Sequence, residues 1–330
     1  MPVKNEGKIL SVQYLRGLAA LGVVLCHYGS SLTLYPKLSS FFNFGQTGVF
    51  VFFLVSGFII VYSLLKSAYK PSQFLRFLLK RSIRIDPPYI CTILLTIIFF
   101  GALALSKGEP LTFSAGRFFA HIFYVVPFTR YPFYNHAFWT LCVEFQFYLV
   151  IGLLYFLNNT TVYRSVFLVV FGLTCLIPFF NAYYLVFNYA PIFALGISLV
   201  TFYENRNLKN AILPTLLLCL TAYKFGLPIA ALLLISSLII LFFKYVVRPL
   251  IFLGNISYSV YLIHDLVLIF FVGIGKILHF EFAHYQLIWL LIETLAAIFC
   301  AWVFYIFIEK PSIKFSKRVF YNRRAIISKE

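Results

Sequence analysis

Two ionisable side chains in the first apolar stretch of the chain have types and a spacing that could do chemistry. Arg16 and His27 are eleven residues apart. In a helix that spacing is about 20° past three full turns, so both side chains would share a face, roughly 16 Å apart along the axis. A guanidinium binds anions, and a neutral imidazole takes a proton from a hydroxyl. The pair would suit a long ligand with an anionic head. The alternative is an interfacial arginine and a histidine that only packs.

A second basic cluster lies between residues 71 and 88, where the alternation of apolar and basic residues predicts a short amphipathic helix that the Pro87-Pro88 pair ends. Arg81 and Arg84 stand at positions i and i+3 and can therefore point at one anion together. Guanidinium groups donate in pairs to phosphate oxygens. A helix lying on anionic lipid would have the same pattern, and spacing alone does not choose between the two.

Several further polar residues lie inside apolar runs, where burial of an unpaired charge is expensive. Glu144 is expected either to pair with an arginine or to belong to a site. Tyr258, Tyr261 and His264 recur at helical spacing and would line a polar cavity, or serve as boundary aromatics beside a satisfied histidine. Glu293, in the last apolar run, is expected to be the structural partner of a buried cation.

The elements that must position these side chains are membrane-spanning helices. The 330 residues are 62% hydrophobic and 11% charged, with a mean hydropathy of +0.92, whereas a soluble domain has about 25% charged residues. This excludes a soluble enzyme, a disordered chain and a disulfide-stapled secreted domain. Because a span needs about 20 apolar residues, the sequence predicts an all-α polytopic membrane protein with about ten transmembrane helices, at approximately 9–34, 42–65, 87–106, 136–157, 163–181, 183–203, 210–223, 226–243, 256–276 and 285–308.

The positive charges predict the orientation of these spans. With both termini in the cytoplasm, 21 of the 27 lysines and arginines fall on the cytoplasmic side, as the positive-inside rule requires. The net charge of +17 is then a matter of topology, and nucleic acid is not an expected partner. The six cysteines lie in apolar runs without a C-x-x-C pair, so neither disulfides nor a metal site are expected. One transmembrane domain, residues 1–330 with a basic tail from about 309, accounts for the chain.

Taken together, these segments resemble the acyltransferase-3 family of integral membrane acyltransferases, from Tyr14 to Pro311. Each motif is weak alone, but their order along the chain is specific. The motifs are an arginine and a histidine separated by ten residues (Arg16, His27), G-V-x-x-F-F-x-x-S-G-F (from Gly48, including Ser56 and Gly57), R-x-x-R-I-x-P-x-Y (from Arg81), W-[ST]-L-x-x-E-x-x-F-Y (from Trp139), L-G-x-x-S-Y-x-x-Y-L-x-H (from Leu253 to His264) and E-K-P (from Glu309).

The resemblance implies transfer of an acyl group, usually acetyl, from acyl-CoA to a sugar hydroxyl. The acceptor would be O-antigen, exopolysaccharide or a lipid-linked precursor, and the location the bacterial inner membrane. No cofactor or metal would be bound, because acetyl-CoA is the donor substrate. The expected partners are acyl-CoA, a carbohydrate or lipid-linked oligosaccharide acceptor and the lipid bilayer. A transporter of an organic anion or of an acylated glycan intermediate is the alternative that the residues leave open.

The resemblance also implies roles for single residues. His27 would act as general base on the acceptor hydroxyl or accept the acyl group itself. Many relatives carry an aspartate where this chain has Phe50, so Glu144 is expected to act as the catalytic carboxylate in its place. The donor phosphates would be bound by Arg16, Arg81 and Arg84. The supporting or acceptor-facing residues would be Ser56, Gly57, Trp139, Tyr258, Tyr261 and His264.

The segment 117–139, predicted to lie on the outer side, is rich in aromatic residues. Aromatic faces stack on sugar rings, so this segment is a candidate for receiving the acceptor. The alternative, which the sequence slightly favours, is an aromatic belt at the membrane boundary.

Overall fold

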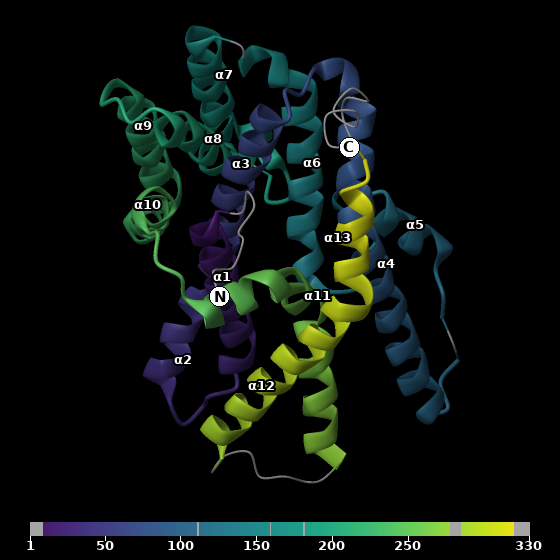
Figure 1. The fold of residues 1–330 in the computed structure, drawn as a ribbon. Helices are drawn as coiled ribbons and strands as arrows, with labels where there is room; N and C mark the ends of the chain where they lie inside the picture. The colour runs from purple at the N-terminus through teal and green to yellow at the C-terminus, as the bar shows by residue number, and fades with distance from the viewer. Residues whose placement is uncertain (1–8, 111, 159, 181, 278–284, 320–330) are drawn as a thin grey trace. The chain divides into compact units, whose positions relative to one another are not determined.

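The structure is a computed structural model that describes residues 9–110, 112–158, 160–180, 182–277 and 285–319. Within these ranges the regular elements are all helical, without a β-strand (Figure 1). This confirms the predicted all-α class. Lys4, Lys8 and the basic tail beyond residue 319, which the predicted orientation uses, lie outside the described residues.

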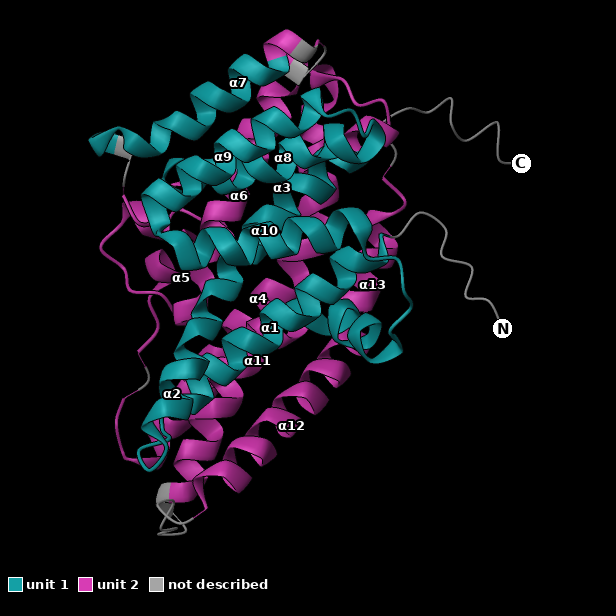
Figure 2. Cartoon of the chain, turned by 90° about the vertical axis from the view of Figure 1, so that its left-hand side faces the viewer, with its two compact units in different colours: residues 1–63, 164–181, 187–258 teal, residues 64–163, 182–186, 259–330 magenta. Residues whose placement is uncertain are grey.

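The helices divide into two compact units that interleave along the sequence (Figure 2). Unit 1 comprises residues 1–63, 164–181 and 187–258, and unit 2 comprises residues 64–163, 182–186 and 259–330. Each unit therefore collects segments that are distant in sequence. Helix α11 (Arg248–Ile277) contributes its first part to unit 1 and its second part to unit 2.

Unit 1 is built from apolar helices that pack closely through glycines. In α3, a Cβ atom on Gly57 would lie 2.4 Å from the carbonyl oxygen of Phe193 in α8, and one on Gly196 of α8 would lie 2.2 Å from the carbonyl oxygen of Leu54. Only glycine fits at either position. The helices of this unit are α1 (Leu10–Gly29), α2 (Pro36–Asn43), α3 (Gly48–Lys66), α7 (Thr161–Leu173), α8 (Ala190–Glu204), α9 (Lys209–Phe225) and α10 (Leu227–Phe242).

Unit 2 contains the longest helix of the described chain, α4 (Phe74–Ser106). It also holds α5 (Ala115–Ile122), α6 (Trp139–Leu154), the second part of α11 and α12 (Gln286–Phe304). After α12 the chain passes through a π-helical turn, Tyr305–Glu309, into α13 (Lys310–Ser316). The predicted start of a tail near residue 309 therefore falls inside helical structure.

The described residues contain seven helical segments long and apolar enough to cross a membrane. Two shorter apolar helices, Val162–Leu176 and Leu227–Phe242, match further predicted spans. The total of ten spans and the cytoplasmic location of both termini remain predictions. The seven candidates are Leu10–Gly29, Pro36–Lys66, Pro71–Ser106, His136–Leu157, Val186–Glu204, Arg248–Gly275 and Gln286–Ser316.

One expectation is wrong: Pro87 and Pro88 do not end a helix. Helix α4 runs through both prolines as one element. Each proline lacks an N–H and so removes one hydrogen bond of the helix ladder, but apolar surroundings leave the chain no better way to satisfy its other backbone groups than to continue the helix. The predicted break between the spans 163–181 and 183–203 is confirmed, because the 3₁₀ turns Thr174–Leu176, Pro178–Phe180 and Val186–Tyr189 separate α7 from α8.

Candidate functional site

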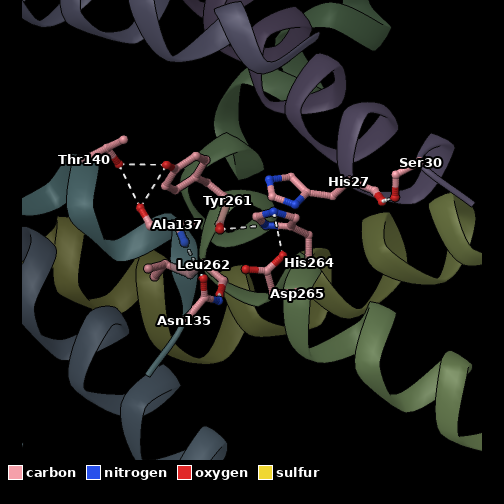
Figure 3. Close-up of polar contacts among 9 residues, drawn as sticks. All are labelled: His27, Ser30, Asn135, Ala137, Thr140, Tyr261, Leu262, His264 and Asp265. Atoms are coloured by element: carbon pink, nitrogen blue, oxygen red, sulfur yellow. Dashed lines mark hydrogen bonds and ion pairs between the residues drawn. The ribbon is translucent and has the colours of Figure 1, made fainter. Parts of the chain in front are cut away.

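Arg16 and His27 both lie on α1, as predicted, and both are half-buried. The helix is uninterrupted between them, so the predicted shared face follows from its geometry. His27 is in the last turn, because α1 ends at Gly29 and not near residue 34. The Ser30 hydroxyl donates to the main-chain carbonyl of His27 (2.7 Å; Figure 3), which satisfies one of the carbonyls left over at the helix end.

The place where many relatives carry an aspartate is aromatic in unit 1. The Phe50 ring lies 5.3 Å from the Phe225 ring and 6.1 Å from the Tyr189 ring, centroid to centroid. Of these rings only Tyr189 carries a polar group. Of the other residues predicted in this unit, Gly57 serves close helix packing, and Ser56 and Tyr258 are half-buried.

In unit 2, two sequence motifs converge on one pocket. Arg81 comes from the R-x-x-R motif on α4 and Glu144 from the W-T-L-x-x-E motif on α6. The pocket thus places a cation and a carboxylate around one space, a polar constellation typical of ligand sites. Its full lining is Arg81, Ser82, Ile85, Asp86, Tyr124, Leu141, Glu144, Phe145 and Tyr148.

Aromatic rings and a phenol hold the charged groups of this pocket in place. The Tyr148 hydroxyl donates to the Glu144 carboxylate at 2.5 Å. The guanidinium carbon of Arg81 lies 5.5 Å from the Phe77 ring centroid and 5.9 Å from the Tyr148 ring centroid, within cation–π range. Arg84 is close enough to Tyr148 to interact with it electrostatically. Arg81, Arg84 and Glu144 are therefore brought together.

Sequence reasoning missed Asp86 and Tyr124, which form the other wall of the pocket. The Tyr124 hydroxyl donates to the Asp86 carboxylate at 2.8 Å. The Tyr124 ring is stacked between Tyr89 (5.1 Å, 13°) and Phe145 (4.7 Å, 14°). Its backbone has φ of 57°, a left-handed conformation that is strained for a tyrosine. The surrounding rings hold it there. The one feature of the sequence that could have indicated Asp86 is its place in the R-x-x-R-I-x-P-x-Y motif, at the variable position before Pro87.

A second polar group of unit 2 lies around the turn of α11 that carries Tyr261 and His264 (Figure 3). The Tyr261 and Thr140 hydroxyls are 2.7 Å apart, and the Tyr261 hydroxyl donates to the Ala137 carbonyl at 3.0 Å. The Nδ1 atom of His264 lies 2.8 Å from the Tyr261 carbonyl and must carry a hydrogen to bond it. Its Nε2 lies 3.3 Å from the Asp265 carboxylate.

The glutamate of the E-K-P motif is hydrogen-bonded to α11. Glu309 is buried, and its carboxylate accepts from the Ser259 main-chain N–H at 3.1 Å and from the Ser259 hydroxyl at 2.5 Å. Charge-assisted hydrogen bonds of this kind are among the stronger ones in proteins. They hold α11 two residues before Tyr261.

The segment 117–139 is fastened through Arg117 and His121. The guanidinium of Arg117 donates to the carbonyls of Pro132 (2.9 Å) and Phe133 (2.8 Å) and stacks 3.9 Å over the Tyr134 ring. The Tyr134 N–H donates to Nε2 of His121 at 3.1 Å, so this nitrogen carries no hydrogen. Burial lowers the pKa of His121 to about 4, in agreement with that bond.

The structure does not test every predicted partnership. Arg16 and His27 belong to unit 1, whereas Arg81, Arg84, Glu144, Trp139, Tyr261 and His264 belong to unit 2. The pairing of His27 with Glu144 therefore stays a prediction. Within unit 2, Glu144 has Tyr148 as a hydrogen-bond donor.

Comparisons with known proteins identify the family of the chain. The sequence model of the acyltransferase-3 family, described as an acyltransferase domain, matches residues 9–308. The chain is also 30% identical over 169 residues to nodulation protein 10 of Rhizobium leguminosarum bv. viciae. That similarity covers 46% of this chain and 45% of the relative, so the chain spans about half the length of the curated relative it matches. No solved structure matches.

Proposed function

The chain belongs to the acyltransferase-3 family, and from this premise we propose that it moves an acetyl group from acetyl-CoA to a sugar hydroxyl. The acceptor is a cell-surface polysaccharide, of the O-antigen or exopolysaccharide kind, or its lipid-linked precursor. The protein works in the bacterial inner membrane, in keeping with its apolar helices. Acetyl-CoA is consumed as a substrate and no bound cofactor takes part.

The observation that carries this proposal is the convergence of two family motifs on the pocket of unit 2. Arg81, with Arg84 nearby, supplies the fixed positive charge that coenzyme A phosphates require. Glu144, fixed by Tyr148, supplies a carboxylate at the same place. Arg16 on α1 is the third donor-binding arginine of the proposal.

The proposed chemistry conserves atoms and protons. The sugar hydroxyl oxygen attacks the thioester carbonyl while His27 accepts the hydroxyl proton. The carbon–sulfur bond then breaks, and the thiolate takes that proton to leave as coenzyme A. In the second route, an imidazole nitrogen of His27 attacks the thioester, and the carbon–sulfur bond breaks to release the thiolate. The sugar hydroxyl oxygen then attacks the acetyl group on His27, the carbon–nitrogen bond breaks, and the hydroxyl proton passes through the imidazole to the thiolate. Both routes need a neutral imidazole at the start.

The test uses the full chain purified in lipid nanodiscs with acetyl-CoA labelled in the acetyl group. The acceptor is a preparation of oligosaccharides released from the surface polysaccharide of cells that lack the gene. We expect alkali-labile label in the oligosaccharide and one free coenzyme A thiol for each acetyl group transferred. NMR of the polysaccharide from cells with and without the gene then identifies the modified sugar.

A transporter would give a different result. It would produce neither labelled oligosaccharide nor free thiol, but it would carry labelled acetyl-CoA or glycan across the membrane of sealed proteoliposomes. That outcome would reject the proposed transfer reaction.

A further inference from the structure

Tyr183 holds an aromatic ring outward from a short non-helical stretch of unit 2. This stretch, residues 182–186, separates α7 from α8 in the sequence but belongs to unit 2. The Tyr183 side chain is 47% exposed. None of the family motifs includes it, and the proposed donor pocket does not contain it.

Two further rings brace Tyr183. The Trp139 ring, only 8% exposed, lies 4.6 Å from it at an angle of 43°, and the Tyr184 ring lies 5.1 Å away at 84°. Aromatic pairs at these distances attract each other beyond the effect of burial alone. The plane of the Tyr183 ring is therefore set by its neighbours while one side remains open.

The backbone of this stretch is clamped by one side chain. The amide nitrogen of Gln146 donates to the Tyr184 carbonyl at 2.9 Å, and its amide oxygen accepts from the Val186 N–H at 3.1 Å. A single glutamine thus satisfies a main-chain acceptor and a main-chain donor at once. A tyrosine that served only to anchor the protein at the membrane boundary would not need its backbone fixed in this way.

The exposed ring lies beside polar groups. Tyr183 is close enough to Tyr261 to interact with it electrostatically, and the Tyr261 hydroxyl is bonded to Thr140. Four residues after Tyr261, the Asp265 side chain is 14% exposed. An apolar face near a partly exposed carboxylate matches a pyranose ring, which has C–H groups on its face and hydroxyls around its edge.

We propose that Tyr183, braced by Trp139 and Tyr184, is a stacking subsite for a pyranose ring of the acceptor. The Asp265 carboxylate, at the end of the same turn of α11, meets the hydroxyls at the edge of that ring. This inference rests on the proposed transfer to sugar and adds how the sugar is recognised. It also adds the stretch 182–186 to the segment 117–139, whose last residue is Trp139, as a candidate for receiving the acceptor.

The test compares three variants in the transfer assay, with the same oligosaccharides as acceptor. Tyr183→Ala removes the ring, Tyr183→Phe keeps the ring and removes only the hydroxyl, and Tyr285→Ala is the matched control. Tyr285 is a tyrosine of similar exposure, 54%, at the start of α12. We expect Tyr183→Ala to raise the acceptor KM about tenfold, which is about 1.4 kcal/mol, with the acetyl-CoA KM unchanged. Tyr183→Phe and Tyr285→Ala should stay near the parent value.

Three outcomes overturn the subsite. They are an unchanged acceptor KM in Tyr183→Ala, an equal rise in Tyr285→Ala, and a loss in Tyr183→Phe as large as that in Tyr183→Ala. Equilibrium dialysis of the labelled oligosaccharides without donor separates this inference from the proposed function. Binding that Tyr183→Ala weakens, in a protein that transfers no acetyl group, keeps the subsite and rejects the transfer.

Discussion

A histidine that removes a proton from a sugar hydroxyl must be neutral and must be reachable by the substrate. His27 is half-buried in the last turn of α1, and its main-chain carbonyl is capped by Ser30. The His27 ring therefore lies at a helix end where the Ser30 hydroxyl is hydrogen-bonded to a main-chain carbonyl. This placement, at a helix end, suits a base that must meet the substrate.

Replacing His27 with glutamine should abolish most of the transfer and leave the fold intact. Glutamine keeps polarity and approximate size but removes the titrating group, and loss of a general base typically lowers the rate about 10²–10⁴-fold. The measurement is acetyl transfer by purified variant, together with acetyl-CoA binding, which should persist. His136→Gln is the control, because His136 is exposed and belongs to none of the motifs. Near-normal transfer by His27→Gln would make His27 a packing residue.

Replacing Arg81 or Arg84 with glutamine should weaken donor binding specifically. Each charged hydrogen bond lost costs about 1.5–3 kcal/mol, so the acetyl-CoA KM should rise by well over tenfold while the acceptor KM stays unchanged. Arg76→Gln is the matched control, since Arg76 lies on the same helix but is exposed. If all three variants have the same acetyl-CoA KM, the arginines of α4 contact lipid headgroups and do not bind the donor.

The residues of the pocket show how far a sequence can predict a site. Arg81, Arg84 and Glu144 could be selected because charges inside apolar runs need a reason, and they do converge. Asp86 and Tyr124 could not be selected. In the sequence, Asp86 is one polar residue among many in a basic segment. Its hydrogen-bond partner Tyr124 lies beyond the end of α5, so the sequence gives no sign that the two residues meet. The left-handed backbone of Tyr124 leaves no signature in residue type.

At the scale of single elements, the segment 117–139 depends on one neutral imidazole. Nε2 of His121 accepts from the Tyr134 N–H, so a proton on that nitrogen removes the acceptor. The folded-state pKa of about 4 lies below the unfolded value of about 6.5. Between these values the unfolded segment binds more protons than the folded one, so its stability falls as the pH drops from about 6.5 to about 4.

Hydrogen exchange should detect this loss. Amide exchange in residues 131–135, corrected for its intrinsic pH dependence, should accelerate as the pH is lowered through that window. His121→Gln cannot titrate and should show no such step. A step of equal size in both proteins would assign the pH dependence to another group.

The contact between α3 and α8 gives a second prediction at this scale. Gly57→Ala places a methyl group against the Phe193 carbonyl, and overpacking of this kind typically destabilises by about 1–3 kcal/mol. The Tm of the purified protein should fall. Gly273→Ala is the control, because a Cβ atom there meets nothing within 4 Å. A normal Tm with a raised acceptor KM in Gly57→Ala would instead restore the acceptor-facing role that the sequence suggested for Gly57.

At the scale of the whole molecule, hydropathy predicts helices well and their ends poorly. The short stretch near residues 210–223 is helical as expected and forms α9. Gly226, with φ of 91°, separates α9 from α10. The unbroken course of α4 through two prolines was not predictable from local preferences, because backbone groups in an apolar environment favour continued helix. The assembly of distant segments into two units has no local signal at all.

The predicted topology can be tested by cysteine labelling. Single cysteines at positions 70 and 317, in a variant whose six native cysteines are replaced, should be protected from an impermeant maleimide in intact cells. Both positions belong to basic segments that the positive-inside rule places in the cytoplasm. A cysteine at position 131, predicted outside, should be labelled. Labelling at position 70 would also place Arg81 and Arg84 on the wrong side for cytoplasmic acetyl-CoA.

The unbroken α4 has a further consequence, which concerns the thickness of the bilayer. Its 33 residues extend about 50 Å at 1.5 Å per residue, whereas the hydrocarbon core is about 30 Å thick. The surplus length is the basic end that carries Arg76, Arg81 and Arg84. Longer or shorter lipid chains make such a helix tilt to match its surroundings. Because no flexible joint separates the basic end from the span, tilting the span moves these arginines with it. If they bind the donor as proposed, we expect lipid chain length to alter the affinity for acetyl-CoA.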